Sequence, residues 1–337
     1  MVERGYAARR MGFSPRGAAV SPRPRKGGSP LSEERKVMYR RSFLAILPGM
    51  GIALAQTPQS EPNAPPNRPK VPGTLSLRAR RRVEQAPGSG KSIPSEEVLR
   101  WEVAQTAIIV IDMWDTHLCA LSAERVAAMA PRMNQVVDAA RSLGVQIIHA
   151  PSDTMKYYAG RPGRLRMQRA PLAPSPFPVR ATEPDREEQR KMPQAACDDP
   201  VAVKWNGPAP ATTRGNYPWE REHPAIQIGG YDGISDSGQE IYNFCKQEGI
   251  TNVALMGVHT NICILNRAFG VRDMKRLGFQ VVVARDLTDA MYDPRKRPFV
   301  SHARGTELVI EHIEADWCPS ILGEDLMRVI PGTDGPA

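Results

Sequence analysis

The sequence lacks the features that mark several classes of protein. Its 337 residues contain no internal repeat, no CxxC pair and no close Cys/His spacing of the kind that holds a structural zinc ion. Hydrophobic residues make up 41% of the chain and charged residues 24%. This balance excludes a disordered chain, a collagen-like repeat and a small disulfide scaffold. It leaves enough apolar side chains for one large or two small domains.

Outside its first 55 residues, the chain also lacks an excess of charge of either sign. Residues 1–55 hold 11 of the 45 lysines and arginines but 3 of the 36 acidic residues, so they supply +8 of the net charge of +9. The other residues hold 34 basic and 33 acidic side chains. Binding to nucleic acid requires a basic surface that follows the phosphates. Because the charge outside the leader is balanced, we do not expect a nucleic-acid partner.

The basic leader ends in a pattern typical of an export signal. Arg40 and Arg41 precede about a dozen apolar or small residues, and residues 53–55 (ALA) suit a cleavage site. Segment 38–55 resembles a twin-arginine (Tat) signal, which implies passage through the Tat export machinery to a periplasmic or extracellular location. We expect a mature chain that begins near Gln56. The alternative is an N-terminal anchor, although the apolar run is shorter than the ~20 residues that span a bilayer.

The cysteine count is informative once export is expected. The five cysteines are Cys119, Cys197, Cys245, Cys263 and Cys318. An odd number in an oxidising compartment leaves at least one thiol outside any intrachain disulfide, and such a thiol can be reactive.

We expect four consecutive regions: the leader at 1–55, a Pro-rich linker and N-terminal arm at 56–99, a main domain at 100–325, and a C-terminal tail at 326–337. In the main domain, short β-branched runs alternate with helical stretches. That alternation predicts an α/β fold, a three-layer sandwich with a central, mostly parallel sheet and helices on both faces. The expected strands are 106–111, 145–149, 252–256 and 279–284, and the expected helices are 123–143, 239–247, 262–276 and 302–313.

One segment of the main domain breaks this alternation. Residues 151–224 contain 13 prolines and little periodicity. A connection this long is unusual in a compact domain, so we expect an ordered lid or an interface for pairing with a second copy of the chain. A disordered insertion is the alternative.

Chemically useful side chains follow the expected strands, where open parallel sheets bind ligands. Asp112 ends the first strand, His149 ends the second, and Cys263 follows the strand 252–256 at the start of a helix. The helix dipole favours a thiolate there, backbone N–H groups can stabilise an oxyanion, and Asp112 could accept the thiol proton. The structural alternatives are a small buried hydrophobe for Cys263 and a loop cap for Asp112.

Three segments together resemble the isochorismatase-like cysteine hydrolase family. Residues 107–114 (AIIVIDMW) resemble its opening motif, and residues 253–263 (VALMGVHTNIC) resemble its nucleophile motif. Residues 278–290 (GFQVVVARDLTDA) resemble the next strand with its Asp-rich end. The likeness covers roughly residues 100–320, apart from the Pro-rich segment, and it is more specific for the fold than for the substrate.

The resemblance implies a hydrolase of small molecules with a Cys-Asp-Lys triad and no cofactor, often assembled as a homo-oligomer. Cys263 would attack an amide or related carbon as a thiolate, while Asp112 would take the thiol proton and later activate water. The backbone N–H groups of His259 and Cys263 would form the oxyanion hole, with a cis peptide bond between Val258 and His259.

The sequence departs from the family pattern in two places. The triad lysine has no counterpart at residues 225–229 (AIQIG), where the resemblance places its strand. Lys204 is the candidate replacement, and an ordinary solvated lysine is the alternative reading of it. Nicotinamidases, the metal-binding branch, carry Asp-x-His after the second strand, whereas residues 153–155 read DTM. We therefore expect neither a metal site nor nicotinamidase activity.

The loop after Asp112 carries further candidates. Asp115, His117 and Cys119 alternate, so in extended backbone they could face Cys263 together. We expect Trp114, Asp115 and His117 to bind substrate as the lining of its pocket. The alternatives are a metal site in this loop or a disulfide from Cys119.

The preferred hypothesis is an exported hydrolase that cleaves a non-peptide, amide-type C–N bond of a small molecule through a thioester on Cys263. The alternative is a catalytically inactive family member that acts as a small-molecule binding or interaction module. The absent strand lysine favours this alternative unless Lys204 or another cation takes its place. A third hypothesis is a secreted metal-binding protein that uses His117, Cys119 and His149.

Overall fold

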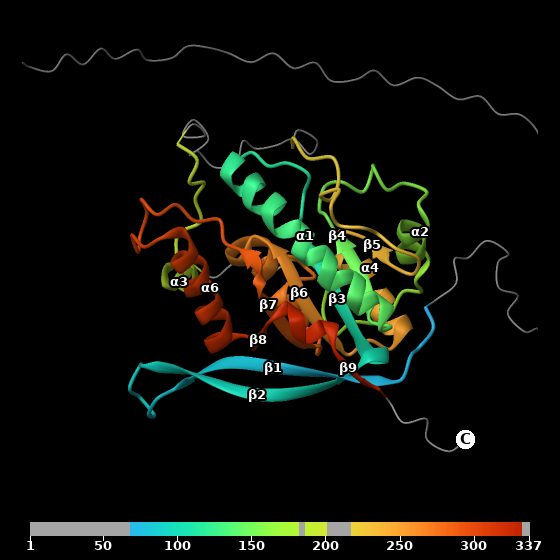
Figure 1. Ribbon diagram of the computed structural model, residues 1–337, viewed down its shortest axis with the longest axis horizontal. Coiled ribbons are helices and arrows are strands. Elements are labelled where there is room, and N and C mark those ends of the chain that lie inside the picture. Colours follow the sequence, from blue (N-terminus) through green and yellow to red (C-terminus); the bar gives the residue numbers. More distant parts are fainter. Residues whose placement is uncertain (1–67, 182–185, 201–216, 332–337) are drawn as a thin grey trace, which may run out of the picture. The chain divides into compact units, whose positions relative to one another are not determined.

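One sheet forms the centre of the structure. The computed structural model describes residues 68–181, 186–200 and 217–331, all within one unit, Ser60–Ala337 (Figure 1). The expectations for the leader, its cleavage site and Lys204 concern residues outside these ranges. The strands are β1 (Gly73–Glu84), β2 (Ser92–Glu102), β3 (Thr106–Ile111), β4 (Gln146–Ala150), β5 (Gly233–Ile234), β6 (Asn252–Val258), β7 (Gln280–Asp289), β8 (Ser320–Ile321) and β9 (Val329–Pro331).

The middle of the sheet is parallel, as expected from the sequence. In the described part of the chain the strand order is β2-β1-β8-β7-β6-β3-β4-β5, and β9 pairs with β1. The strands from β8 to β5 run parallel to one another, whereas β1 pairs antiparallel with β8. Every residue of β3, β4 and β6 is buried, which explains why these segments are apolar without alternation.

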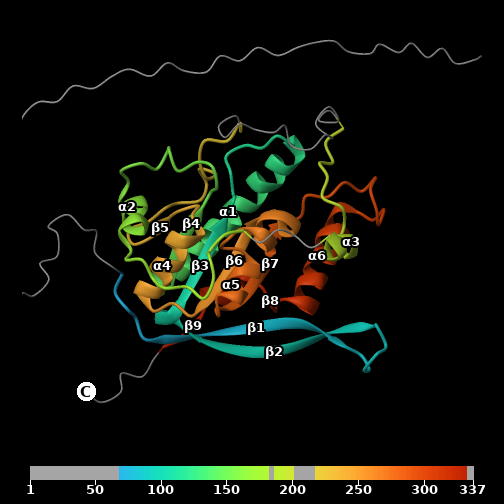
Figure 2. The ribbon, with the colours of Figure 1, turned by 180° about the vertical axis from the view of Figure 1, so that it is seen from behind.

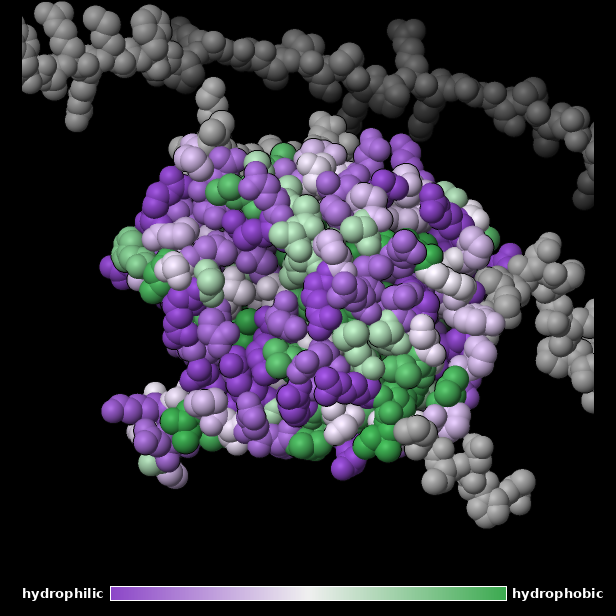
Figure 3. Space-filling model, viewed as in Figure 1, coloured by the Kyte–Doolittle hydropathy of each residue, from purple (hydrophilic) through white to green (hydrophobic). Residues whose placement is uncertain are grey.

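Helices cover both faces of the sheet, so the predicted three-layer α/β fold is confirmed. Helix α1 lies over one face (Figure 1), and α4 and α5 lie over the other (Figure 2). Along β3, Ile109 and Ile111 pack in the core with α4, α5 and α6, whereas Ile108 and Val110 pack in the core with α1. Figure 3 shows hydrophilic and weakly hydrophobic residues interleaved on the side of the molecule that α1 covers. The helices are α1 (Ala120–Ser142), α2 (Pro162–Arg169), α3 (Arg186–Lys191), α4 (Gly238–Glu248), α5 (Val271–Arg276) and α6 (His302–Asp316).

The helix expected over 262–276 is wrong as one continuous element. The chain forms a π-helical turn at Thr260–Ile264 and then α5, with Gly270 as the N-cap of α5. A Cβ on Gly270 would lie 2.6 Å from the Ile264 carbonyl oxygen, so the backbone packs too closely there for any other residue. The break leaves Cys263 on a short turn instead of at the start of a long helix.

The arm expected before residue 100 includes a long hairpin that extends the sheet. Strands β1 and β2 pair antiparallel, with Leu75 opposite Trp101. Arg80 on β1 contacts Glu307 and Glu314 of α6 at 2.7 Å each, and Glu314 is fully buried. The hairpin therefore joins the domain through ion pairs as well as through its buried leucines.

The Pro-rich segment contains short helices where the structure describes it. Helix α2 packs against β5: a Cβ on Gly233 would meet the Met167 sulfur at 2.4 Å. Helix α3 lies near α6 (Figure 1), where Glu188 binds His312 at 2.8 Å. Within the described ranges, no helix is both long and apolar enough to cross a bilayer.

Candidate active site

Cys263 lies on the π-helical turn that follows β6, and its side chain is buried. The approach to this turn depends on Gly257, whose φ is +119° and whose added Cβ would lie 2.0 Å from the Ile111 carbonyl oxygen. Only glycine allows the end of β6 to lie this close to the end of β3. The next peptide bond, Val258–His259, is cis, as the resemblance implies.

Asp112 is the first residue after β3, and it is fully buried with a positive φ of 51°. Its backbone N–H donates to the Ala150 carbonyl at 3.2 Å, and its Oδ1 accepts from the Ser152 N–H at 2.8 Å. The carboxylate also lies close enough to the Cys263 thiol to raise the pKa of that thiol. The structure therefore brings together the two residues that the sequence places at neighbouring strand ends.

The cation beside them is Arg267, which the sequence analysis missed. Its Nε and Nη2 each lie 2.9 Å from Asp112 Oδ2. Its backbone N–H donates to the Cys263 carbonyl at 3.0 Å, so it is one helical turn beyond the nucleophile and shares its face. The four-residue spacing between Cys263 and Arg267 was the sequence signal that could have identified this cation. Residues 225–229 form no strand, and Lys204 lies outside the described ranges.

Burial decides the resting charge of Cys263. Burial is the main cause that raises the pKa of the thiol to about 12; Asp112 contributes to this rise, and Arg267 opposes it. The expectation of a resting thiolate is therefore not supported, because a turn of five residues has too small a dipole to offset burial. The thiol is protonated at rest and is positioned to pass its proton to Asp112.

His259 is fixed next to the nucleophile. Its backbone N–H lies close enough to the Cys263 sulfur to lower the pKa of the thiol, as suits a donor of an oxyanion hole. Its Nε2 lies 2.5 Å from the Ser122 hydroxyl. Burial, with a smaller contribution from His117, lowers the pKa of His259 to about 3, so the ring is neutral.

Comparison with known sequences decides the family. The family model described as "Isochorismatase domain" matches residues 106–309. The chain belongs to the isochorismatase family. No curated relative matches the sequence.

Solved structures with a similar chain course include further proteins of this kind, all at low identity. A cysteine hydrolase from Pseudomonas syringae pv. phaseolicola is 16% identical, with 69% of this chain and 96% of that one covered and a TM-score of 0.42. An isochorismatase family protein from Burkholderia thailandensis is 13% identical, with coverage of 66% and 96% and a TM-score of 0.38. A nicotinamidase/pyrazinamidase from Acinetobacter baumanii is 14% identical, with coverage of 66% and 98% and a TM-score of 0.33.

In this isochorismatase-family chain, the loop after Asp112 holds a second segment in place. The Trp114 ring stacks on Trp219 at 4.3 Å, and its Nε1–H donates to the Ser152 carbonyl at 2.9 Å. The His117 ring lies parallel to Trp219 at 5.4 Å. Asp115 Oδ1 accepts from the Glu220 N–H at 3.1 Å. The three expected pocket residues thus contact residues 219–220, and their role in binding substrate stays a prediction.

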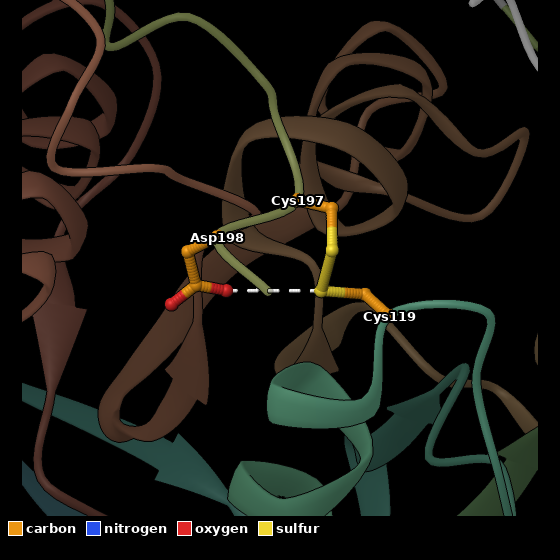
Figure 4. Close-up of side chains that lie close together, drawn as sticks. All are labelled: Cys119, Cys197 and Asp198. Carbon is orange, nitrogen blue, oxygen red and sulfur yellow. Dashed lines mark hydrogen bonds between the residues drawn. A yellow bond between two sulfur atoms is a disulfide. The ribbon is translucent and has the colours of Figure 1, made fainter. Parts of the chain in front are cut away.

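Cys119 is bonded to Cys197, one of the alternatives that the sequence leaves open. Figure 4 shows Asp198 beside this disulfide, its Oδ1 3.7 Å from Cys119 Sγ. Among the described residues, these three form a group whose potential ligand atoms lie within 4.8 Å of one another, but disulfide sulfurs are not available as thiolate ligands. Arg125 binds Asp198 at 2.9 Å, which fixes the disulfide-linked segment to α1.

His149, the third residue of the metal hypothesis, is held by carboxylates. Its Nδ1 lies 2.7 Å from Glu222 and its Nε2 3.0 Å from Asp232, which also binds Arg141 at 2.8 Å. Burial alone would lower the pKa of His149, but the two carboxylates raise it to about 9. Both ring nitrogens are occupied, so His149 has no free ligand atom to share with His117. The metal hypothesis is not supported.

Proposed function

We propose that the protein is an exported cysteine hydrolase that cleaves a non-peptide, amide-type C–N bond of a small molecule. The observation that carries the proposal is the set of Cys263, Asp112 and Arg267, in which the thiol and the carboxylate are buried and the guanidinium is partly exposed. A thiol, a carboxylate and a permanent cation in contact supply a nucleophile, a general base and a counter-charge without a lysine. The match to the family model supports hydrolysis. The choice of an amide-type C–N bond rests on the resemblance to the family.

The reaction begins with the protonated thiol. Sulfur attacks the amide carbon as the thiol proton moves to Asp112, and the oxygen of the tetrahedral intermediate accepts hydrogen bonds from the His259 and Cys263 backbone N–H groups. The C–N bond then breaks, and the leaving amine takes the proton from Asp112. Water attacks the resulting thioester while Asp112 accepts its proton, the acid is released, and Asp112 returns that proton to the sulfur. Arg267 orients the carboxylate through both steps and offsets its charge.

Export and assembly belong to the same proposal. The Tat-like segment 38–55 supports export, and the Cys119–Cys197 disulfide is of a kind that persists in oxidising compartments. Assembly as a homo-oligomer rests on the resemblance.

The second candidate, a binding module without turnover, is favoured by one observation: burial keeps the Cys263 thiol protonated. A panel of small primary amides, assayed for ammonia release and for acylated protein by intact mass spectrometry, separates the two. The hydrolase predicts turnover, a thioester adduct on Cys263, and a loss of at least about 1000-fold in Cys263→Ala. Cys318→Ala, a matched change at another buried thiol, should retain activity.

Saturable ligand binding with neither product nor adduct would favour the binding module. Turnover retained in Cys263→Ala would reject the thioester mechanism.

A further inference from the structure

A large cavity lies on the outer side of the turn that carries Cys263. Its volume is about 1280 Å³, at least the size of ordinary small-molecule pockets. Four parts of the fold meet there: the segment 189–195, the π-helical turn and the residues after it, the loop before α6, and α6 itself. The lining residues are Gln189, Arg190, Lys191, Met192, Pro193, Gln194, Ala195, Asn261, Ile262, Asn266, Arg297, Pro298 and Leu308. Cys263 and Asp112 do not line this cavity, so it is separate from the reacting groups.

The charges around this cavity have one sign. Arg190, Lys191 and Arg297 line it, and its lining includes no carboxylate among the described residues. None of the three has an ion pair with a described residue, whereas Arg80 and Arg267 each bind carboxylates. Three exposed cations around one concave space, none paired with a described carboxylate, attract an anion.

Asn266 adds a hydrogen-bond acceptor that lacks a partner in the described part of the chain. Its Oδ1 is buried and has no hydrogen-bond partner among the described residues. The neighbouring Asn261 differs, because its amide donates to the Met291 carbonyl and accepts from the Met291 N–H, both at 3.0 Å. A buried acceptor without a partner costs free energy, which a ligand N–H or O–H group would recover if the Asn266 side chain turns its oxygen toward the cavity on binding.

We propose that this cavity binds a small organic acid that carries both a carboxylate and an N–H or O–H donor. The carboxylate pairs with Arg190, Lys191 and Arg297, and the donor satisfies Asn266. The inference goes beyond the proposed hydrolysis and does not depend on it, because binding there uses neither Cys263 nor Asp112.

The test measures binding to the full chain with three isosteric probes: succinamate, which has one carboxylate and one amide, succinate, and neutral succinamide. Dissociation constants from ligand-observed NMR in low-salt buffer should rank succinamate tightest, with succinamide at least about tenfold weaker. The triple variant Arg190→Gln, Lys191→Gln, Arg297→Gln should weaken succinamate about tenfold or more. The matched control, Lys91→Gln, Arg100→Gln, Lys156→Gln, removes three other exposed cations and should change nothing.

Asn266→Leu separates the two parts of the ligand. It should weaken succinamate several-fold while leaving succinate within about twofold. The proposal is overturned if succinamide binds as tightly as succinamate, or if the triple variant behaves like its control. Since no readout requires turnover, these outcomes are independent of whether Cys263 is a nucleophile.

Discussion

Two buried charge clusters lie at neighbouring strand ends, and they differ in what they leave free. At the end of β3, Asp112 contacts Arg267 and the Cys263 thiol. At the end of β4, His149 lies between two carboxylates. The strands are paired, with Ile111 opposite Ala150, so the two clusters share one edge of the sheet.

The two clusters differ in how completely their charged and hydrogen-bonding groups are paired. In the β4 cluster both nitrogens of His149 are used, and Asp232 also binds Arg141, so two cations face two carboxylates. In the β3 cluster one carboxylate faces one guanidinium, and the neutral thiol keeps a proton that it can transfer. A strongly shifted histidine pKa therefore does not mark the reactive site here. The proposed reactive site is marked instead by a thiol proton that a neighbouring carboxylate can accept.

The largest effect should come from breaking the β3 cluster at Arg267. Arg267→Met leaves Asp112 buried without its counter-charge, so we expect turnover to fall about 100-fold or more and stability to fall by about 3–5 kcal/mol. Arg267→Lys keeps the charge and should recover part of both. Amide turnover and urea denaturation measure these changes. A methionine variant that is as active as the lysine variant would show that the cation is not needed.

The β4 cluster should respond to pH through stability and not through activity. The folded-state pKa of His149 is raised to about 9 from an ordinary 6.5, so its contribution is complete below pH 6.5 and is lost as pH rises through 9. The loss is on the order of 3 kcal/mol. His149→Leu should flatten this part of the stability curve and keep turnover within about threefold. Denaturation from pH 6 to 9.5 checks the slope, and a steep loss of activity in this variant would contradict the comparison.

The smallest effect concerns the thiol pKa within the β3 cluster. Because Asp112 raises the pKa of Cys263 and Arg267 lowers it, Asp112→Asn should label faster with iodoacetamide at pH 8 to 9, and Arg267→Met more slowly. Peptide mass spectrometry reads the labelling at each cysteine. Cys245 and Cys318 are internal controls, since burial raises the pKa of each to about 12. Equal rates at Cys263 in both variants would mean that neither charge affects the thiol.

Parts of the site could be predicted because their signals are local. Asp112 and Cys263 follow short apolar runs, and parallel strands place their carboxyl ends at one edge whatever the loops do. The role of Arg267 could not be predicted this way, because it depends on the π-helical turn that directs its guanidinium to Asp112. Residues 225–229, where the resemblance places the triad lysine, contain no lysine and form no strand.

Contacts between side chains far apart in the sequence could not be predicted from local patterns. His149 meets Glu222 and Asp232 across 73 and 83 residues, and Cys119 meets Cys197 across 78. No periodicity connects these positions.

The sequence by itself determined the layered sheet, the family and the pairing of a carboxylate with a cysteine, because hydrophobic runs and strand ends are properties of neighbouring residues. Only the tertiary structure decided which cation serves that pair, which cysteines join, and that the Cys263 thiol rests protonated. These three depend on burial and on distances across the fold, and both arise when separate segments pack together.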